Sequence, residues 1–130
     1  MGMHKVKQNS SEEKRVVTEL RVKKEEKKLI VSFETGERFE IPAELLRVES
    51  PSAEVQGHSP AEKKIIPGRR HVGIIGAEPV GNYAVKLVFD DLHDTGMFTW
   101  SYLFWLGENM NDVWNDYLTN LEAAGLSRDP

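Results

Sequence analysis

Residues 88–107 constrain the fold of this chain more than any other stretch. They hold two of the three tryptophans and a histidine, His93, with carboxylates on both sides. Apolar alternation predicts a strand that ends at Phe89, followed by an acidic turn around His93. A short strand through Phe98 and Trp100 is expected next, leading into a helical C-terminus. The aromatic core and the candidate functional site are therefore expected to meet in this stretch.

Alternating apolar and polar residues predict a β-meander in the first part of the chain. Its predicted strands are residues 18–23, 29–33 and 39–41. Between the last two strands, Gly36 can take the positive φ that a tight hairpin turn requires. Pro42 then ends the third strand, and a short helical turn is predicted over residues 43–47.

The second half of the chain is predicted to contain another hairpin. Its strands are residues 71–76 and 83–89, and the turn lies at residues 78–82. Residues 101–106 are expected to form a buried helical turn that ends at Gly107. Between the two hairpins, residues 48–70 lack periodicity and contain three prolines, so a long loop or a set of short turns is expected there. A loop of that length is often functional, which makes it a candidate binding surface.

A C-terminal helix is predicted from apolar residues at helical spacing. These residues are Met110, Val113, Trp114, Tyr117, Leu118 and Leu121. Asn109 is the expected N-cap, and Gly125 is expected to end the helix in the left-handed conformation. Together the elements predict an α+β fold, a two-layer sandwich in which this helix packs on one face of a largely antiparallel sheet.

The composition predicts one domain over residues 17–126, preceded by a disordered tail over residues 1–16. The 130-residue chain has no cysteine, which excludes disulfides and thiolate metal ligands. No apolar run approaches the length of a membrane span and no secretory signal is present, so a cytoplasmic protein is expected. Residues 29–130 carry eight Lys and Arg against sixteen Asp and Glu. Nucleic-acid binding is not expected, because a phosphate backbone requires a basic face.

Four strings in the sequence carry a family resemblance: LLRVESPSAEVQGH, GRRHVGI, EPVGNYA and FDDLHDTGMFTWSYL. Their order and spacing resemble the gamma-butyrobetaine hydroxylase-like N-terminal domain family over roughly residues 17 to 107. In that family the domain stands alone in bacteria, precedes 2-oxoglutarate- and iron-dependent hydroxylase domains, or is fused to P-loop ATPases with iron–sulfur clusters. The resemblance implies an accessory module.

The same resemblance implies the position of a former zinc site. The hydroxylases hold zinc with a Cys-Pro-Cys-x-x-Cys run and one histidine, and these four ligands correspond to Ser50, Ser52, Val55 and His93. Structural zinc requires four donors and serine is a poor one. The backbone of the site is therefore expected to persist without the metal.

A metal site of another composition is the alternative hypothesis. Imidazole and carboxylate ligands suit iron, manganese or zinc. The proposed ligands are His93, Asp94, His58 and His71, with Glu49 or Glu54 as helpers. The competing interpretation is a structural turn histidine, either raised in pKa by the nearby carboxylates or hydrogen bonded to the loop that carries the two serines.

Arg69 and Arg70 form a candidate anion-binding or partner-binding loop, with a solvated loop edge as the alternative. The sequence contains no nucleophile elbow, phosphate loop or paired-carboxylate spacing, so catalysis is not expected. The expected function is that of a non-catalytic accessory module that binds a protein partner, inferred from the resemblance. A metal-binding domain with iron or zinc at His93 is the alternative.

Overall fold

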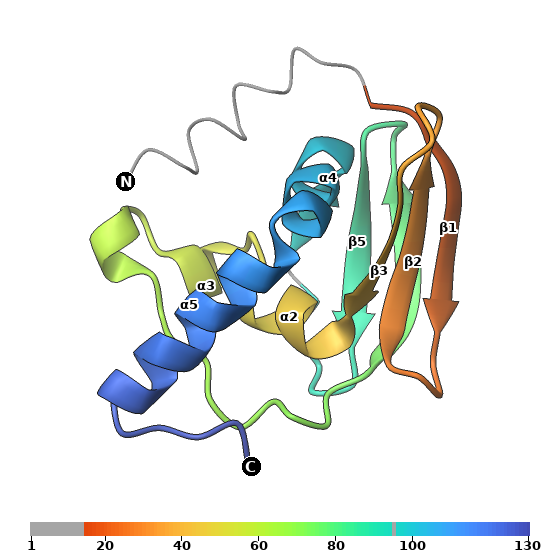
Figure 1. Cartoon of the computed structure of the whole chain (residues 1–130). Helices are drawn as coiled ribbons and strands as arrows, with labels where there is room; N and C mark the ends of the chain where they lie inside the picture. The colour runs from red at the N-terminus through yellow and green to blue at the C-terminus, as the bar shows by residue number, and fades with distance from the viewer. Residues whose placement is uncertain (1–14, 95) are drawn as a thin grey trace.

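The structure is a computed structural model that describes residues 15–94 and 96–130. The strands form one layer, and α2, α4 and α5 lie on one side of it (Figure 1). This arrangement confirms the predicted α+β two-layer fold with a C-terminal helix. Most of the predicted tail, residues 1–16, lies outside the described residues. Within the described part of the chain, no helix is long and apolar enough to cross a membrane.

The first three strands form the predicted meander, an antiparallel sheet of order β1-β2-β3. The strands are β1 (Val17–Lys23), β2 (Lys28–Phe33) and β3 (Arg38–Pro42). Gly36 has a φ of +108°, and its N–H donates to the Phe33 carbonyl, which confirms the predicted tight turn. Leu29 and Val31 on the central strand are fully buried, as the alternation requires.

The second sheet has the order β4-β5-β6. Its strands are β4 (Ile74–Val80), β5 (Ala84–Phe89) and β6 (Met97–Thr99). The predicted hairpin is confirmed, but its turn begins later than the predicted residue 78, because β4 continues through Pro79 to Val80. As an edge strand, β4 tolerates a residue without a backbone N–H. The strand predicted through Trp100 is also too long, since Thr99 Oγ1 accepts the N–H of Tyr102 and a helix begins at Trp100.

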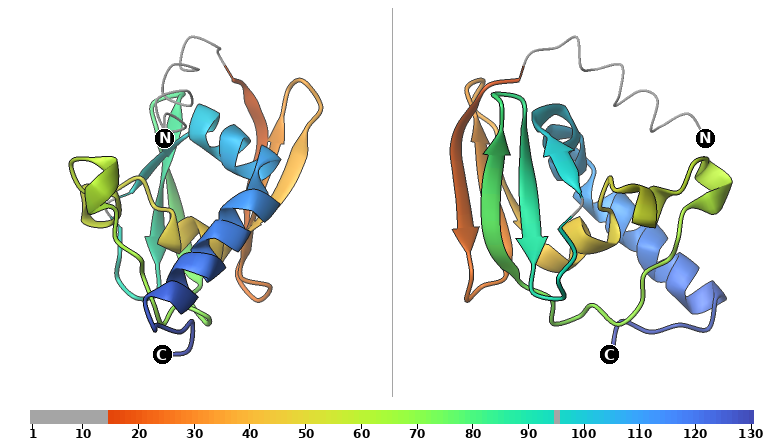
Figure 2. Two further views of the ribbon diagram at one scale, coloured as in Figure 1. Left: turned by 60° about the vertical axis from the view of Figure 1, so that its left-hand side comes forward. Right: turned by 180° about the vertical axis from the view of Figure 1, so that it is seen from behind.

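Among residues 15–94 and 96–130, five helical segments cover the sheets and the loop between them. They are α2 (Ala43–Val48), α3 (Ala53–Gln56), the 3₁₀ turn η2 (Pro60–Glu62), α4 (Trp100–Glu108) and α5 (Met110–Ala123). Residues 48–70 contain two short helical turns, which confirms the second of the two predicted alternatives for this segment. The C-terminal tail returns beneath α2 to this segment (Figure 2), where the Gly68 N–H donates to the Ser127 carbonyl.

The ends of the helices differ in part from the sequence prediction. Gly107 does not end α4 but lies inside it. Asn109 precedes α5 without capping it, since its side-chain amide donates to the Trp105 carbonyl at the end of α4. Gly125 does end α5, with a φ of +70°, and the Leu126 N–H donates to the Leu121 carbonyl. The left-handed glycine at this end is the one the sequence predicted.

A single main core joins both sheets to α2 and α4. Phe89 and Phe98 from the second sheet and Leu103 from α4 are fully buried in it. The prediction that core and candidate site meet in residues 88–107 is thus confirmed for the core. A smaller cluster around Val48, Tyr117 and Leu121 fixes α5 to the segment that follows α2.

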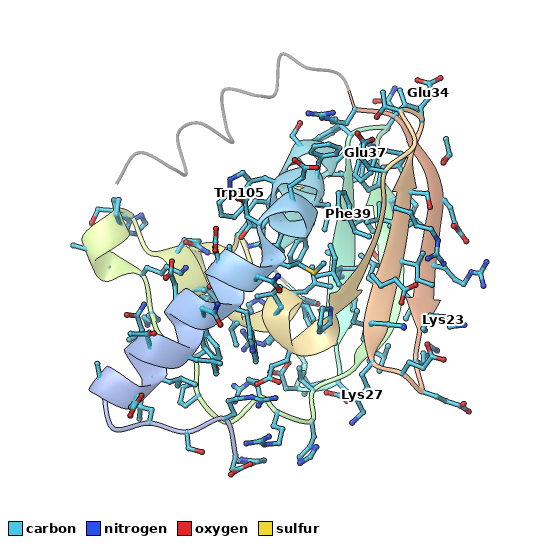
Figure 3. The ribbon with its side chains drawn as sticks, in the orientation of Figure 1. Lys23, Lys27, Glu34, Glu37, Phe39 and Trp105 are labelled. Carbon is cyan, nitrogen blue, oxygen red and sulfur yellow. The ribbon has the colours of Figure 1, made fainter. Side chains whose placement is uncertain are left out.

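Gly107 supports a test of how tightly α4 packs on the first sheet. A Cβ added at Gly107 would overlap the ring of Phe39, which points from β3 toward α4 (Figure 3). We expect Gly107→Ala to lower the free energy of unfolding by about 1–3 kcal/mol, the usual cost of overpacking a core contact. Urea denaturation measures it. The neighbouring exposed change Glu108→Ala should stay within about 0.5 kcal/mol, and equal effects of the two changes would contradict the tight contact.

Candidate functional site

His93 lies in the turn between β5 and β6 and is only 7% exposed. Its Nε2 lies 3.0 Å from Ser50 Oγ and 3.3 Å from Ser52 Oγ. Its Nδ1 lies 3.1 Å from Glu54 Oε1. These four residues, here called the His93 cluster, bring the segment around α3 against the turn. The predicted hydrogen bonding of His93 to the serine loop is confirmed.

The contacts of the His93 cluster favour a neutral imidazole. When Nδ1 carries the proton it donates to Glu54, and Nε2 accepts from a serine hydroxyl. Burial, together with the positive charge of Arg47, lowers the pKa of His93 below its usual value, against the opposing carboxylates Glu54, Asp91 and Asp94. The expectation that nearby carboxylates raise this pKa is therefore wrong, because the loss of hydration outweighs their charge.

A second polar contact fixes the same turn through Asp91. One carboxylate oxygen, Oδ2, accepts from Arg47 Nε of α2 at 2.8 Å and from Arg69 Nε at 2.7 Å. The other oxygen, Oδ1, accepts the backbone N–H of His93 at 3.2 Å. Burial raises the pKa of Asp91, but the hydrogen bonds from Arg47 and His93 outweigh burial and the pKa is lowered. Residues 90–94, here called the acidic turn, are thus held on both sides.

In the His93 cluster a serine contacts the histidine, which contacts a carboxylate, as in the catalytic triad of a hydrolase. The solvent exposure of the serine and of the carboxylate is reversed, however. In a triad the nucleophile faces the substrate and the acid is buried. Here Ser50 is fully buried, and a Cβ added at Gly96 would overlap its Oγ. The Glu54 side chain is instead 66% exposed. In this arrangement a substrate cannot reach Ser50 Oγ. The contacts of the cluster hold the segment around α3 against the turn between β5 and β6.

The predicted metal ligands do not come together as a group. Within residues 15–94 and 96–130, no three His, Asp or Glu side chains are arranged to hold a metal ion. His58 and His71 are exposed on separate segments, and both ring nitrogens of His93 already have partners. Asp94 is also exposed. Of the four ligand positions implied by the resemblance only His93 is a zinc donor, so these residues do not fit structural zinc.

Arg69 and Arg70, the predicted anion or partner loop, both contact the chain itself. Arg69 binds Asp91 and donates to the Pro67 carbonyl. Arg70 forms an ion pair with Asp129 of the C-terminal tail. A hollow of about 160 Å³ lies beside them, lined by Gly68, Arg69, His71, Val72, Asp90, Asp91 and Pro130. Anion binding at these arginines stays a prediction.

Sequence reasoning missed two residues of this region. Arg47 is 7% exposed, and its Nη1 has no hydrogen-bond partner among the described residues. A signal was available, because this arginine stands inside the apolar run of α2. Leu92, at the tip of the acidic turn, has a φ of +71° and is 82% exposed. Nothing in the sequence marks Leu92 as a left-handed residue.

The lowered pKa of His93 predicts how stability depends on pH. The unfolded chain takes up this proton near the usual histidine pKa of about 6.5, whereas the folded chain takes it up only at lower pH. The contribution of His93 to stability is therefore complete above that value and is lost as the pH falls below it. We expect the thermal midpoint to fall between pH 7 and 5, and to fall less in His93→Gln. Parallel pH profiles for the two proteins would contradict this assignment.

Known proteins resemble this chain in sequence and in structure. A sequence model of a family described as gamma-butyrobetaine hydroxylase-like, N-terminal, matches residues 20–104. No curated protein matches the sequence. Two proteins solved in solution by NMR are similar in structure. One is 46% identical, with a TM-score of 0.77, and the match covers 89% of this chain and 91% of that one. The other is 47% identical, with a TM-score of 0.78 and coverage of 90% and 87%.

A crystal structure from Acidithiobacillus ferrooxidans is also similar. It is described as a protein of unknown function of the DUF971 family. The two chains are 36% identical with a TM-score of 0.59, and the match covers 70% of this chain and 91% of that one. The matched family region includes the α3 segment and all residues from β5 to β6, and so contains the whole His93 cluster.

Proposed function

Since this chain belongs to the gamma-butyrobetaine hydroxylase-like N-terminal family, we propose that it is an accessory module that binds a protein partner and performs no catalysis itself. The similar protein from Acidithiobacillus ferrooxidans is described as having an unknown function, so the proposal depends on the site of this chain. We further propose a cytoplasmic location. The acidic charge of residues 29–130 argues against a nucleic-acid partner.

The observation that carries this proposal is the reversed access of the His93 cluster. Its serines and histidine are buried, while Glu54 and the neighbouring residues Asp90, Leu92 and Asp94 of the acidic turn face solvent. Buried polar groups that satisfy one another fix a unique local conformation. Such an arrangement supports presentation of a rigid surface turn better than it supports chemistry at the serines. A metal-binding function has less support, because both ring nitrogens of His93 are already engaged.

Affinity capture of the full-length chain from its native host tests this function. We expect one or a few proteins to copurify in near-stoichiometric amounts, as identified by quantitative mass spectrometry. The comparison variant is Asp91→Ala, which releases the acidic turn from Arg47 and Arg69 and should reduce recovery. Circular dichroism of this variant checks that the remaining fold is retained. Recovery of no partner, or a stoichiometric metal in protein purified without a histidine tag, would favour the metal-binding alternative.

A further inference from the structure

Leu92 combines two features that do not stabilise the folded state. Its φ of +71° lies in the left-handed region, which strains residues with a Cβ atom. Its side chain is 82% exposed, the highest value among the large exposed hydrophobic residues of the described chain. Glycine or asparagine would form the same turn with less strain. The stability of the turn therefore does not explain why a leucine stands at this position.

Lys27 provides a comparison within the same chain. It is the other described residue besides glycine with a positive φ, at +57°. Its carbonyl accepts the Ala43 N–H and its Nζ donates to the His71 carbonyl at 2.8 Å, so tertiary contacts offset its strain. The hydrogen bonds at Leu92 involve only its backbone, where the N–H donates to the Phe89 carbonyl. The exposed side chain of Leu92 is therefore available for a contact with another molecule.

The acidic turn presents Leu92 on a rigid support. On one side Asp91 is held by Arg47 and Arg69, and on the other His93 is held by the serines of its cluster. The Phe89 N–H also donates to the His93 carbonyl and closes the turn. An anchor side chain that is ordered before binding loses less conformational entropy on association. The clamped turn thus suits Leu92 for insertion into a partner.

The charges beside Leu92 indicate the chemistry of that partner. Asp90 and Asp94 are exposed on either side of it, and neither forms an ion pair with another described residue within the distance of a salt bridge. The exposed Glu54 carboxylate lies at the base of the turn, where it contacts His93. Phosphates of nucleic acids or lipids would be repelled by these carboxylates, whereas Lys and Arg would be attracted.

We propose that the acidic turn is a docking element whose Leu92 inserts into an apolar socket on a partner protein, with Lys or Arg at the rim of the socket facing Asp90 and Asp94. This inference rests on the proposed function and deepens it by naming the surface and the kind of partner. An anchor side chain that is buried in a pocket at the centre of an interface, surrounded by groups that exclude water, can carry a large share of the binding energy.

Photo-cross-linking in the native host tests the surface directly. The full-length chain carries the photoreactive amino acid p-benzoylphenylalanine in place of Leu92, or in place of Tyr83 as an exposed control position on another turn. We expect a protein adduct specific to position 92. Sequencing of the cross-linked peptide should place apolar residues beside Lys or Arg. An adduct with an acidic peptide, a lipid or a nucleic acid, or no adduct specific to position 92, overturns the proposal.

Matched variants then distinguish a loss of the Leu92 contact with the partner from a loss of stability of the fold. Leu92→Asn keeps a residue that tolerates the left-handed conformation but removes the apolar group, so captured partner should fall at least about tenfold without a lower thermal midpoint. Lys27→Asn introduces the same residue at the other position with a positive φ and should leave the amount of captured partner unchanged. The double change Asp90→Asn and Asp94→Asn should weaken capture and reduce its salt dependence.

The outcomes distinguish this inference from the function on which it rests. If Leu92→Asn captures as much partner as the natural chain, the docking surface is wrong and the accessory function stands. If neither the natural chain nor any variant captures a protein, both proposals fail.

Discussion

The triple substitution Ser50→Cys, Ser52→Cys and Val55→Cys is expected to turn the His93 cluster into a zinc site of three cysteines and one histidine. Zinc should then bind the folded chain and raise its free energy of unfolding by about 2.7 kcal/mol at a free metal concentration one hundred times the dissociation constant. Thermal unfolding with and without zinc measures the gain. X-ray absorption should give zinc–sulfur distances near 2.3 Å.

The geometry of the His93 cluster supports this expectation. The oxygens of Ser50 and Ser52 lie 3.0 and 3.3 Å from His93 Nε2. In a tetrahedral zinc site the sulfur and nitrogen donors are separated by about 3.5 Å, given their usual bond lengths. Val55 is buried next to this segment, 1% exposed, at the position of the third cysteine of the relatives. Only small shifts would therefore be required at the two serines.

A control is necessary because three cysteines bind zinc weakly even in an unfolded chain. The triple variant with an added His93→Ala change should lose most of the zinc-dependent stability. The natural chain should gain none, since it has only one of the four donors. Equal stabilisation with and without His93 would show that the histidine does not complete the site.

Trp114→Ala is expected to lower the free energy of unfolding by about 3 kcal/mol, the lower end of the range for removing a large aromatic side chain from a core. Trp114 is half-buried, but it packs against both the main core and the smaller cluster around Val48. Its ring lies 5.3 Å from the ring of Tyr117, and the Arg128 guanidinium lies 5.1 Å from its centre. The substitution removes a side chain that joins α5 to both apolar clusters.

Chemical denaturation followed by circular dichroism measures this loss. The exposed aromatic change Tyr83→Ala should shift stability by no more than about 0.5 kcal/mol. The ion pair of Arg128 with the buried Glu44, at 2.8 Å, is expected to persist in the Trp114 variant. A midpoint that is unchanged by Trp114→Ala would show that α5 contributes little to the stability of the domain.

Several parts of the fold follow from local sequence pattern. Alternation around Leu29 and Val31 predicted the central strand of the first sheet, because one face of that strand is buried. Gly36 and Gly125 predicted two chain reversals, since their left-handed backbone is unfavourable for other residues. The family resemblance predicted that the serine loop lies beside His93, and the hydrogen bonds between them confirm it.

Other features depend on groups that are distant in the sequence. Gly107 lies inside α4, where the absence of a Cβ leaves room for the ring of Phe39 from β3. The pKa of His93 is lowered, since burial and the charge of Arg47 outweigh the neighbouring carboxylates. No local rule ranks these effects, because each depends on the distance and burial that packing alone sets.

The sequence by itself therefore determined the three strands of the first sheet, two of the turns, the last helix and, through its family motifs, the two segments that form the candidate site. Only the tertiary structure decided what that site is. It buried the serines, left Glu54 exposed, and clamped the acidic turn through Asp91 so that Leu92 faces solvent. The physical reason is that periodicity reports which face of an element is apolar, whereas access and charge environment arise from contacts between elements.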